Sequence, residues 1–205
     1  MSVQTAPRAS SGSRLVASGL ALWFVVALAV SLSGGLGRVP VPVIGATIFS
    51  LVALSALALR VVAPLRAWAA GLSVQRLVLF HSVRFVGLAF LVLHARGVLP
   101  DDFALVAGWG DIATATTALL VAFAACPITS SARWWIVGVW NTLGLVDILN
   151  VLRGAIQIGL ANPADVAVLT VFPMSLLPTF VVPLIIVTHG LIFIKLWQQR
   201  TSPRL

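Results

Sequence analysis

The sequence predicts an all-α protein, a polytopic bundle of about six transmembrane helices with both termini in the cytoplasm. Sixty per cent of its 205 residues are hydrophobic, whereas a soluble protein reaches about 45–50% with glycine included. Only 9% are charged, against about 25% in soluble domains. So few charges cannot cover a water-facing surface. The composition therefore excludes a soluble enzyme and a disordered protein, and we expect the chain to lie in a lipid bilayer.

Six apolar runs are each long enough to cross a bilayer, which takes about 20 residues in a helix. Arg, Gly and Pro separate the runs and set their ends. The predicted spans are residues 15–33, 41–62, 74–95, 103–126, 134–152 and 174–197.

The ends of the spans follow from charges and helix breakers. Arg14 precedes the first span, and Pro40 opens the second. Arg96 follows the third span, Pro127 ends the fourth, and Arg153 follows the fifth. Proline cannot donate the backbone bond that a continuing helix needs, so it favours these boundaries.

The remaining segments are predicted from composition. Residues 1–13 are rich in Ser and Thr and are expected to form a disordered cytoplasmic tail. The bundle occupies residues 14–199, and residues 200–205 form a second cytoplasmic tail. Residues 155–173 contain the Asn162-Pro163 turn. A helical hairpin, an extension of the sixth helix or a short interfacial segment could form there, and we favour the interfacial segment.

The distribution of positive charge predicts the orientation. Loops on the cytoplasmic side of membrane proteins carry an excess of Lys and Arg. With the N-terminus inside, the outside segments hold three such residues, Arg38, Arg96 and Arg153. The inside segments hold nine: Arg8, Arg14, Arg60, Arg66, Arg76, Arg133, Lys195, Arg200 and Arg204. An alternative is that the first run is a cleaved signal peptide, although it is longer than the usual apolar region of about 7–15 residues.

Three ionisable residues are predicted to share one depth in the membrane. At the helical rise of about 1.5 Å per residue, Arg84 of the third span lies near mid-bilayer, and Asp111 and Asp147 of the fourth and fifth spans lie within its reach. An isolated charge in hydrocarbon costs at least about 2.5–3.5 kcal/mol, so we expect an ion cluster. The cluster either ties the helices together or binds a substrate or a proton. Any cavity is expected in the outer half, between the last four spans.

The fifth span adds a polar stripe at steps of three residues, Asn141, Gly144, Asp147 and Asn150. Glycine there allows close approach of a neighbouring helix, and the amides supply donors and acceptors. The predicted polar intramembrane cluster is therefore Arg84, Asp111, Asn141, Asp147 and Asn150.

His81 and His189 are predicted to lie at similar depths on different helices, so they are possible axial ligands of a b-type haem. His94 has no such partner. The histidine spacing does not match a zinc motif, and the single Cys126 excludes an internal disulfide and an all-cysteine metal site. We therefore expect no metal site, and no cofactor unless haem is bound.

Four segments together resemble a bacterial family of uncharacterised multi-pass membrane proteins. They are Arg84–Gly87, Leu99–Ile112, Trp140–Asp147 and Leu177–His189. The resemblance covers roughly Leu77 to Leu196 and implies that the Arg, Asp, Asn and His residues of these segments belong together. We expect the protein to reside in the bacterial inner membrane as a multi-pass protein. It carries no known activity.

No motif predicts a reaction, so no catalytic residue is assigned and an enzyme is not the expected class. The main hypothesis is a membrane protein whose Arg/Asp/Asn cluster binds or conducts a small solute or a proton. The alternatives are a haem-binding redox protein and a structural membrane subunit. The expected partners are the lipid bilayer and a small molecule or ion, and not nucleic acid, because the net charge of +8 lies mostly in short loops.

Overall fold

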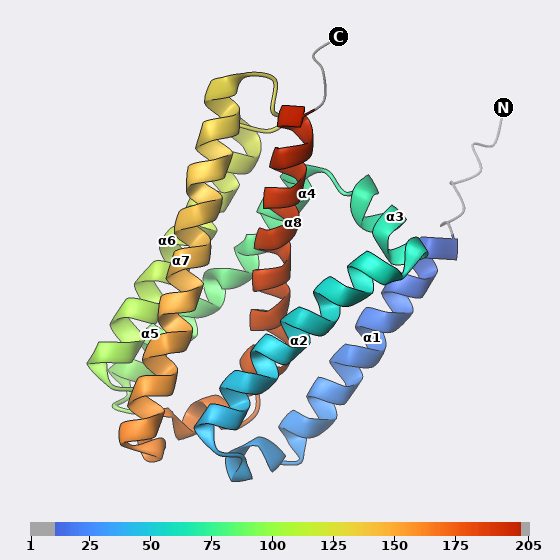
Figure 1. Cartoon of the computed structure of the whole chain (residues 1–205). Coiled ribbons are helices and arrows are strands. Elements are labelled where there is room, and N and C mark those ends of the chain that lie inside the picture. The colour runs from blue at the N-terminus through green and yellow to red at the C-terminus, as the bar shows by residue number, and fades with distance from the viewer. Residues whose placement is uncertain (1–10, 202–205) are drawn as a thin grey trace, which may run out of the picture.

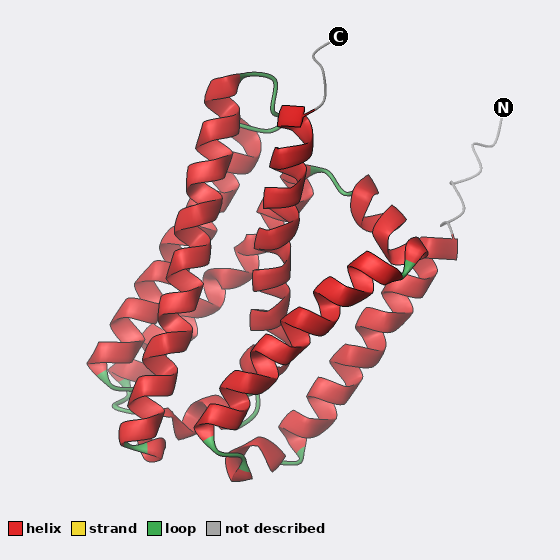
Figure 2. Ribbon diagram, viewed as in Figure 1, coloured by secondary structure: helices red, strands yellow, loops and turns green. Residues whose placement is uncertain are grey.

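The computed structural model describes residues 11–201, and every regular element in that part of the chain is helical (Figures 1 and 2). The first half comprises α1 (Ser11–Leu32), η1 (Gly35–Arg38), α2 (Val41–Val61), α3 (Ala63–Gly71), α4 (Val74–Phe80), η2 (His81–Val86) and α5 (Gly87–Ala95). The second half comprises α6 (Asp101–Ala124), α7 (Ser131–Ala161), η3 (Pro163–Thr170), η4 (Leu177–Val181) and α8 (Val182–Thr201). Most of the predicted disordered tail, residues 1–10, and most of the predicted C-terminal tail lie outside the described residues.

Six helical segments within residues 11–201 are long and apolar enough to cross a membrane. They are Gly12–Leu32, Val41–Val61, Val74–Ala95, Asp101–Ala124, Ser131–Ala161 and Leu177–Arg200. The described chain begins and ends at the same end of the bundle (Figure 1), as an even number of antiparallel passes requires.

The third predicted span is a composite of three elements. α4 leads into a 3-10 segment, η2, and α5 continues to Ala95. Side chains three residues apart are eclipsed in a 3-10 helix. His81 and Arg84 are three residues apart in η2, and both are fully buried. This local geometry directs the His81 imidazole and the Arg84 guanidinium from one face of η2 into the core of the bundle.

α7 is longer than predicted. The fifth span was expected to end at residue 152, but α7 continues to Ala161. Gly154 does not break the helix, and the residues after it are mostly Ala, Ile and Leu, which are compatible with a helix. The helix ends at Asn162, whose extended backbone suits a residue before proline.

The segment after α7 is the 3-10 helix η3, followed by turns and the π-helical η4. Pro183 has no N–H to donate to the Thr179 carbonyl one turn earlier. The indole Nε1 of Trp23 in α1 donates to that freed carbonyl at 2.9 Å. Trp23 and Phe180 also form an edge-to-face pair with ring centroids 5.2 Å apart, so the proline-rich segment anchors α1 to the bundle.

Two buried apolar clusters flank the middle of the bundle. One includes Val78, Ala118, Val137 and Ile192 from α4, α6, α7 and α8. The other includes Phe90 and Phe103 from α5 and α6, together with residues of α7, η4 and the turn before η4. The polar residues described next lie on η2, α6, α7 and α8, between these two clusters.

Candidate functional site

Arg84 is at the centre of the polar core and is completely buried. Its Nε donates to Asp111 Oδ1 at 2.6 Å, its Nη1 donates to the Gly144 carbonyl oxygen at 2.9 Å, and its Nη2 pairs with Asp147 Oδ2. One planar guanidinium thereby joins η2 to α6 and α7, a geometry that a planar fork of donors permits.

Glycines make this close approach possible. A Cβ at Gly87 would lie 2.6 Å from the Gly108 carbonyl oxygen and 2.7 Å from Asp111 Cβ. A Cβ at Gly110 would overlap the Asp147 carboxylate, and one at Gly144 would lie 2.9 Å from His189 Cε1. Small residues let helix backbones approach closely, and here they let the two carboxylates reach Arg84.

The charge of this ion cluster is not balanced. Arg84 contributes one positive charge, and Asp111 and Asp147 each contribute one negative charge in their ordinary ionised states. The Asp111 side chain is 4% exposed, whereas that of Asp147 is 23% exposed. Asp147 lines a surface groove between α6 and α7 with Thr114 and Gly144. When both carboxylates are ionised, this buried or half-buried cluster carries a net charge of −1.

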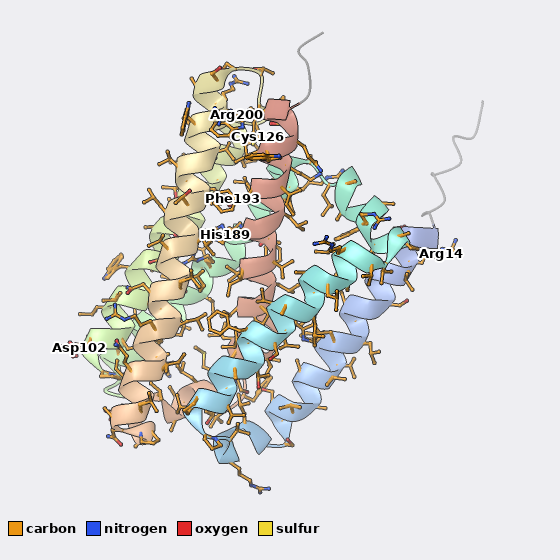
Figure 3. All side chains as sticks on the ribbon, in the orientation of Figure 1. Arg14, Asp102, Cys126, His189, Phe193 and Arg200 are labelled. Atoms are coloured by element: carbon orange, nitrogen blue, oxygen red, sulfur yellow. The ribbon has the colours of Figure 1, made fainter. Side chains whose placement is uncertain are left out.

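Asn141 and His189 form a second set of buried contacts beside the ion cluster. Asn141 Nδ2 donates to the His189 backbone oxygen at 3.1 Å, and Asn141 Oδ1 lies 2.8 Å from His189 Nδ1. The His81 ring stacks on the His189 ring at a centroid distance of 4.1 Å and an angle of 37°. Figure 3 labels His189 on α8, farther from the C-terminal end of that helix than Phe193 and Arg200.

The paired histidines do not fit the haem hypothesis. A six-coordinate b-type haem lies between its two axial imidazoles, so those imidazoles cannot touch each other. The His81 and His189 rings are in direct contact, and both are fully buried. Within residues 11–201, no group of three or more His, Cys, Asp or Glu residues could hold a metal ion.

Asn150 is not part of the cluster, contrary to the prediction. Its side chain is exposed. The reason is rotational: each residue turns a helix by about 100°, so nine residues place Asn150 about 180° from Asn141. Asn141, Gly144 and Asp147 still share the inward side because they span fewer residues.

A cavity of about 100 Å³ reaches Asp111 from the half of the bundle that is remote from the termini. Its wall comes from α2, α5, α6, α7, η3, η4 and α8 and includes Ile48, Phe90, Ile148 and Ile185. Among the wall residues that the structure describes, Asp111 is the one that is charged. The sequence predicted a cavity between the last four spans, whereas α2 also contributes to the wall in the structure.

Residues 41–197 match the sequence model of one protein family, over well more than half of the chain. The chain belongs to this family, the domain of unknown function DUF8737. No curated protein and no solved structure matches the chain. The DUF8737 match begins at the first residue of α2 and includes the ion cluster, the histidine pair and the cavity, while α1 precedes it.

Sequence reasoning missed two contributors to the site. The Thr188 hydroxyl lies 3.3 Å from His81 Nε2. The only feature of the sequence that could have pointed to Thr188 is its position directly before His189. Gly87 was noted only as part of a motif, although its contacts with α6 hold η2 and α5 against Asp111.

Proposed function

We propose that this DUF8737 protein is an integral membrane protein of six spans with both termini in the cytoplasm of a bacterium. The six long apolar helices support this proposal. So do large hydrophobic side chains that are exposed along them, such as Leu54, Leu120 and Phe123, because a soluble protein rarely exposes wide apolar surfaces. The contacts of Trp23 with η4 favour retention of α1 over cleavage as a signal peptide.

A C-terminal reporter fusion is expected to give a cytoplasmic signal. The physical reason is the excess of Lys and Arg in the segments at that end. Alkaline phosphatase and green fluorescent protein fused after residue 205 in a bacterial host report the two compartments. An active phosphatase would reject the orientation.

We propose further that the protein binds a small solute with one positive charge and an apolar body, such as a protonated alkylamine. The observation that carries this proposal is that Asp111 is the one charged residue among the described residues that line the apolar cavity. Asp111 also belongs to the ion cluster, whose net charge is −1 when both carboxylates are ionised. A cation at Asp111 neutralises the cluster, since a buried charge is stable only when it is paired. The apolar walls select against a bare inorganic ion, which would lose its hydration without replacement ligands.

The volume restricts the solute to a few heavy atoms. An engineered apolar cavity of about 150 Å³ admits benzene, so a cavity of about 100 Å³ suits a solute of about the size of n-butylammonium. Ligands this small bind weakly, because even the best reach only about 1.5 kcal/mol per heavy atom.

Calorimetric titration of the detergent-purified protein with n-butylammonium tests the proposal. We expect n-butylammonium to bind at least about tenfold more tightly than n-butanol, equivalent to about 1.4 kcal/mol. Asp111→Asn should remove this preference while n-butanol binding persists, which shows that the cavity is intact. Asp102→Asn, an exposed carboxylate in the first turn of the same helix, is the matched control and should leave the preference unchanged.

Equal affinity for the amine and the alcohol in the native protein would overturn charge recognition. Failure of both to bind would reject the cavity as a solute site, and the ion cluster would then be a structural tie between η2, α6 and α7.

A further inference from the structure

The groove between α6 and α7 is a second open space beside the ion cluster, separate from the solute cavity. Asp147 lines the groove and Asp111 lines the cavity, and neither carboxylate lines both. Arg84 is completely buried and contacts both carboxylates. The ion cluster therefore presents one carboxylate to each of two spaces, and the proposed small solute accounts for only one of them.

The groove is much larger than the cavity. It follows α6 and α7 from Gly110 and Asp147 at the ion cluster to Val121 and Trp135. At a rise of about 1.5 Å per residue, the distance along α7 from Trp135 to Asp147 is about 18 Å. Its volume is about 710 Å³, against about 100 Å³ for the cavity, and sites for drug-sized ligands have about 300–1,000 Å³. The groove therefore has room for a ligand that the cavity excludes.

The groove opens to the side of the bundle. Its wall includes Ile136, Val139 and Leu143, whose side chains are all exposed. In the proposed membrane location this side of α7 faces the hydrocarbon of the bilayer, since no water covers the long apolar helices there. A ligand of the groove must therefore be soluble in lipid.

Asp147 gives this apolar groove its charge. Among the described wall residues, Asp147 is the one that is charged. Its Oδ2 pairs with Arg84, whereas its Oδ1 lies against Gly110 in the wall of the groove. Arg84 is shared with Asp111, so one negative charge has no counter-charge when both carboxylates are ionised. Because a carboxylate away from water is stable only when it is paired, the groove favours a cation.

Two indole rings add to this preference. Trp135 and Trp140 both line the groove. Trp140 Nε1 donates to Thr117 Oγ1 at 3.1 Å, a bond that ties this ring to α6. Tryptophan attracts cations more strongly than the other aromatic side chains. A carboxylate and indole rings in an apolar groove together match a cation whose charge is surrounded by apolar groups.

We propose that this groove binds a bulky lipophilic cation, which reaches it from the bilayer and places its charge near Asp147. Tetraphenylphosphonium is a probe with this chemistry. A further step rests on the proposed function. When both carboxylates are ionised, a single added cation neutralises the ion cluster. A cation in the groove and n-butylammonium in the cavity therefore weaken each other's binding, and by the same factor.

Equilibrium dialysis of the detergent-purified full-length protein, with empty micelles as the baseline, tests the site. Tetraphenylborate is the matched probe, because it has the same shape as tetraphenylphosphonium and the opposite charge. We expect the protein to bind tetraphenylphosphonium at least about tenfold more tightly than tetraphenylborate. Asp147→Asn should remove this preference, whereas Asp102→Asn, which changes an exposed carboxylate outside the groove, should leave it unchanged.

A second variant keeps every charge of the ion cluster. Ala113 is exposed and lines the groove, so Ala113→Phe fills the groove and leaves the three charged residues in place. We expect it to weaken tetraphenylphosphonium binding at least about tenfold and to leave n-butylammonium binding in the cavity unchanged. Ala124→Phe is the matched control, because Ala124 is exposed in the last turn of the same helix and does not line the groove.

Each outcome decides between the claims. Equal affinity for the two tetraphenyl ions, or tetraphenylphosphonium binding unchanged in Ala113→Phe, would overturn the groove as a cation site, and so would a preference that persists in Asp147→Asn. If tetraphenylphosphonium binds and lowers the affinity for n-butylammonium, the competition holds, and independent binding of the two would reject it. If tetraphenylphosphonium binds but n-butylammonium does not, the small-solute proposal fails and the groove site stands.

Discussion

Replacement of Arg84 by alanine is expected to lower the free energy of unfolding by about 3–5 kcal/mol, the usual effect of removing one partner of a buried ion pair. Arg84 is fully buried and donates to three acceptors on α6 and α7. Its loss leaves two carboxylates beside each other without a counter-charge. Thermal or SDS-induced unfolding of the detergent-purified protein measures the effect.

Three further variants separate charge from packing. Arg96→Ala removes an exposed arginine and should change stability by less than about 0.5 kcal/mol. Arg84→Lys keeps the charge but has a single nitrogen where the guanidinium has three, so an intermediate loss is expected. Combining Arg84→Gln with Asp111→Asn and Asp147→Asn removes all three charges and should recover much of the loss. Equal stability of Arg84→Ala and Arg96→Ala would show that the cluster does not stabilise the fold.

The ion cluster could be predicted from the sequence because depth follows from residue count. A rise of about 1.5 Å per residue placed Arg84, Asp111 and Asp147 at one level, and the cost of an unpaired charge in an apolar solvent required them to meet. Both arguments use only the position along a helix. The structure brings the three residues together through contacts of Arg84 with both carboxylates.

The orientation around each helix axis could not be predicted in the same way. Asn150 shares the spacing of the polar stripe but turns to the exposed face, because a step of three residues falls short of a full turn. The contact of the His81 and His189 rings also depends on how each helix is rotated about its axis. The sequence showed only that the two residues lie at a similar depth, which fits both direct stacking of the rings and ligation of a haem between them.

The 3-10 segment η2 has no signal in the sequence. Residues 81–86 contain neither proline nor glycine, the usual local causes of a change in helix type. Tertiary contacts account for it: the segment packs closely on α6, where Arg84 meets Asp111 and where Gly87 meets Gly108.

Replacement of Gly87 by alanine is the second change expected to have a large effect. An added Cβ would lie 2.6 Å from the Gly108 carbonyl oxygen and 2.7 Å from Asp111 Cβ. Neither atom belongs to the flexible end of a side chain, so α5 and α6 must move apart. Overpacking of this kind costs about 1–3 kcal/mol, which is more than the gain of up to about 1 kcal/mol from replacing glycine by alanine in a helix.

Gly190→Ala is the matched control, because the Cβ that it would add meets no atom within 4 Å beyond its chain neighbours and the nearby backbone of its own helix. Gly190 lies in α8 next to His189, so this variant should be neutral or stabilised by up to about 1 kcal/mol. Separation of α5 from α6 in Gly87→Ala also moves Asp111 relative to Arg84. The preference for n-butylammonium over n-butanol should therefore fall in Gly87→Ala and persist in Gly190→Ala. Equal stability and equal preference in the two variants would show that the close approach of α5 and α6 does not position the carboxylate.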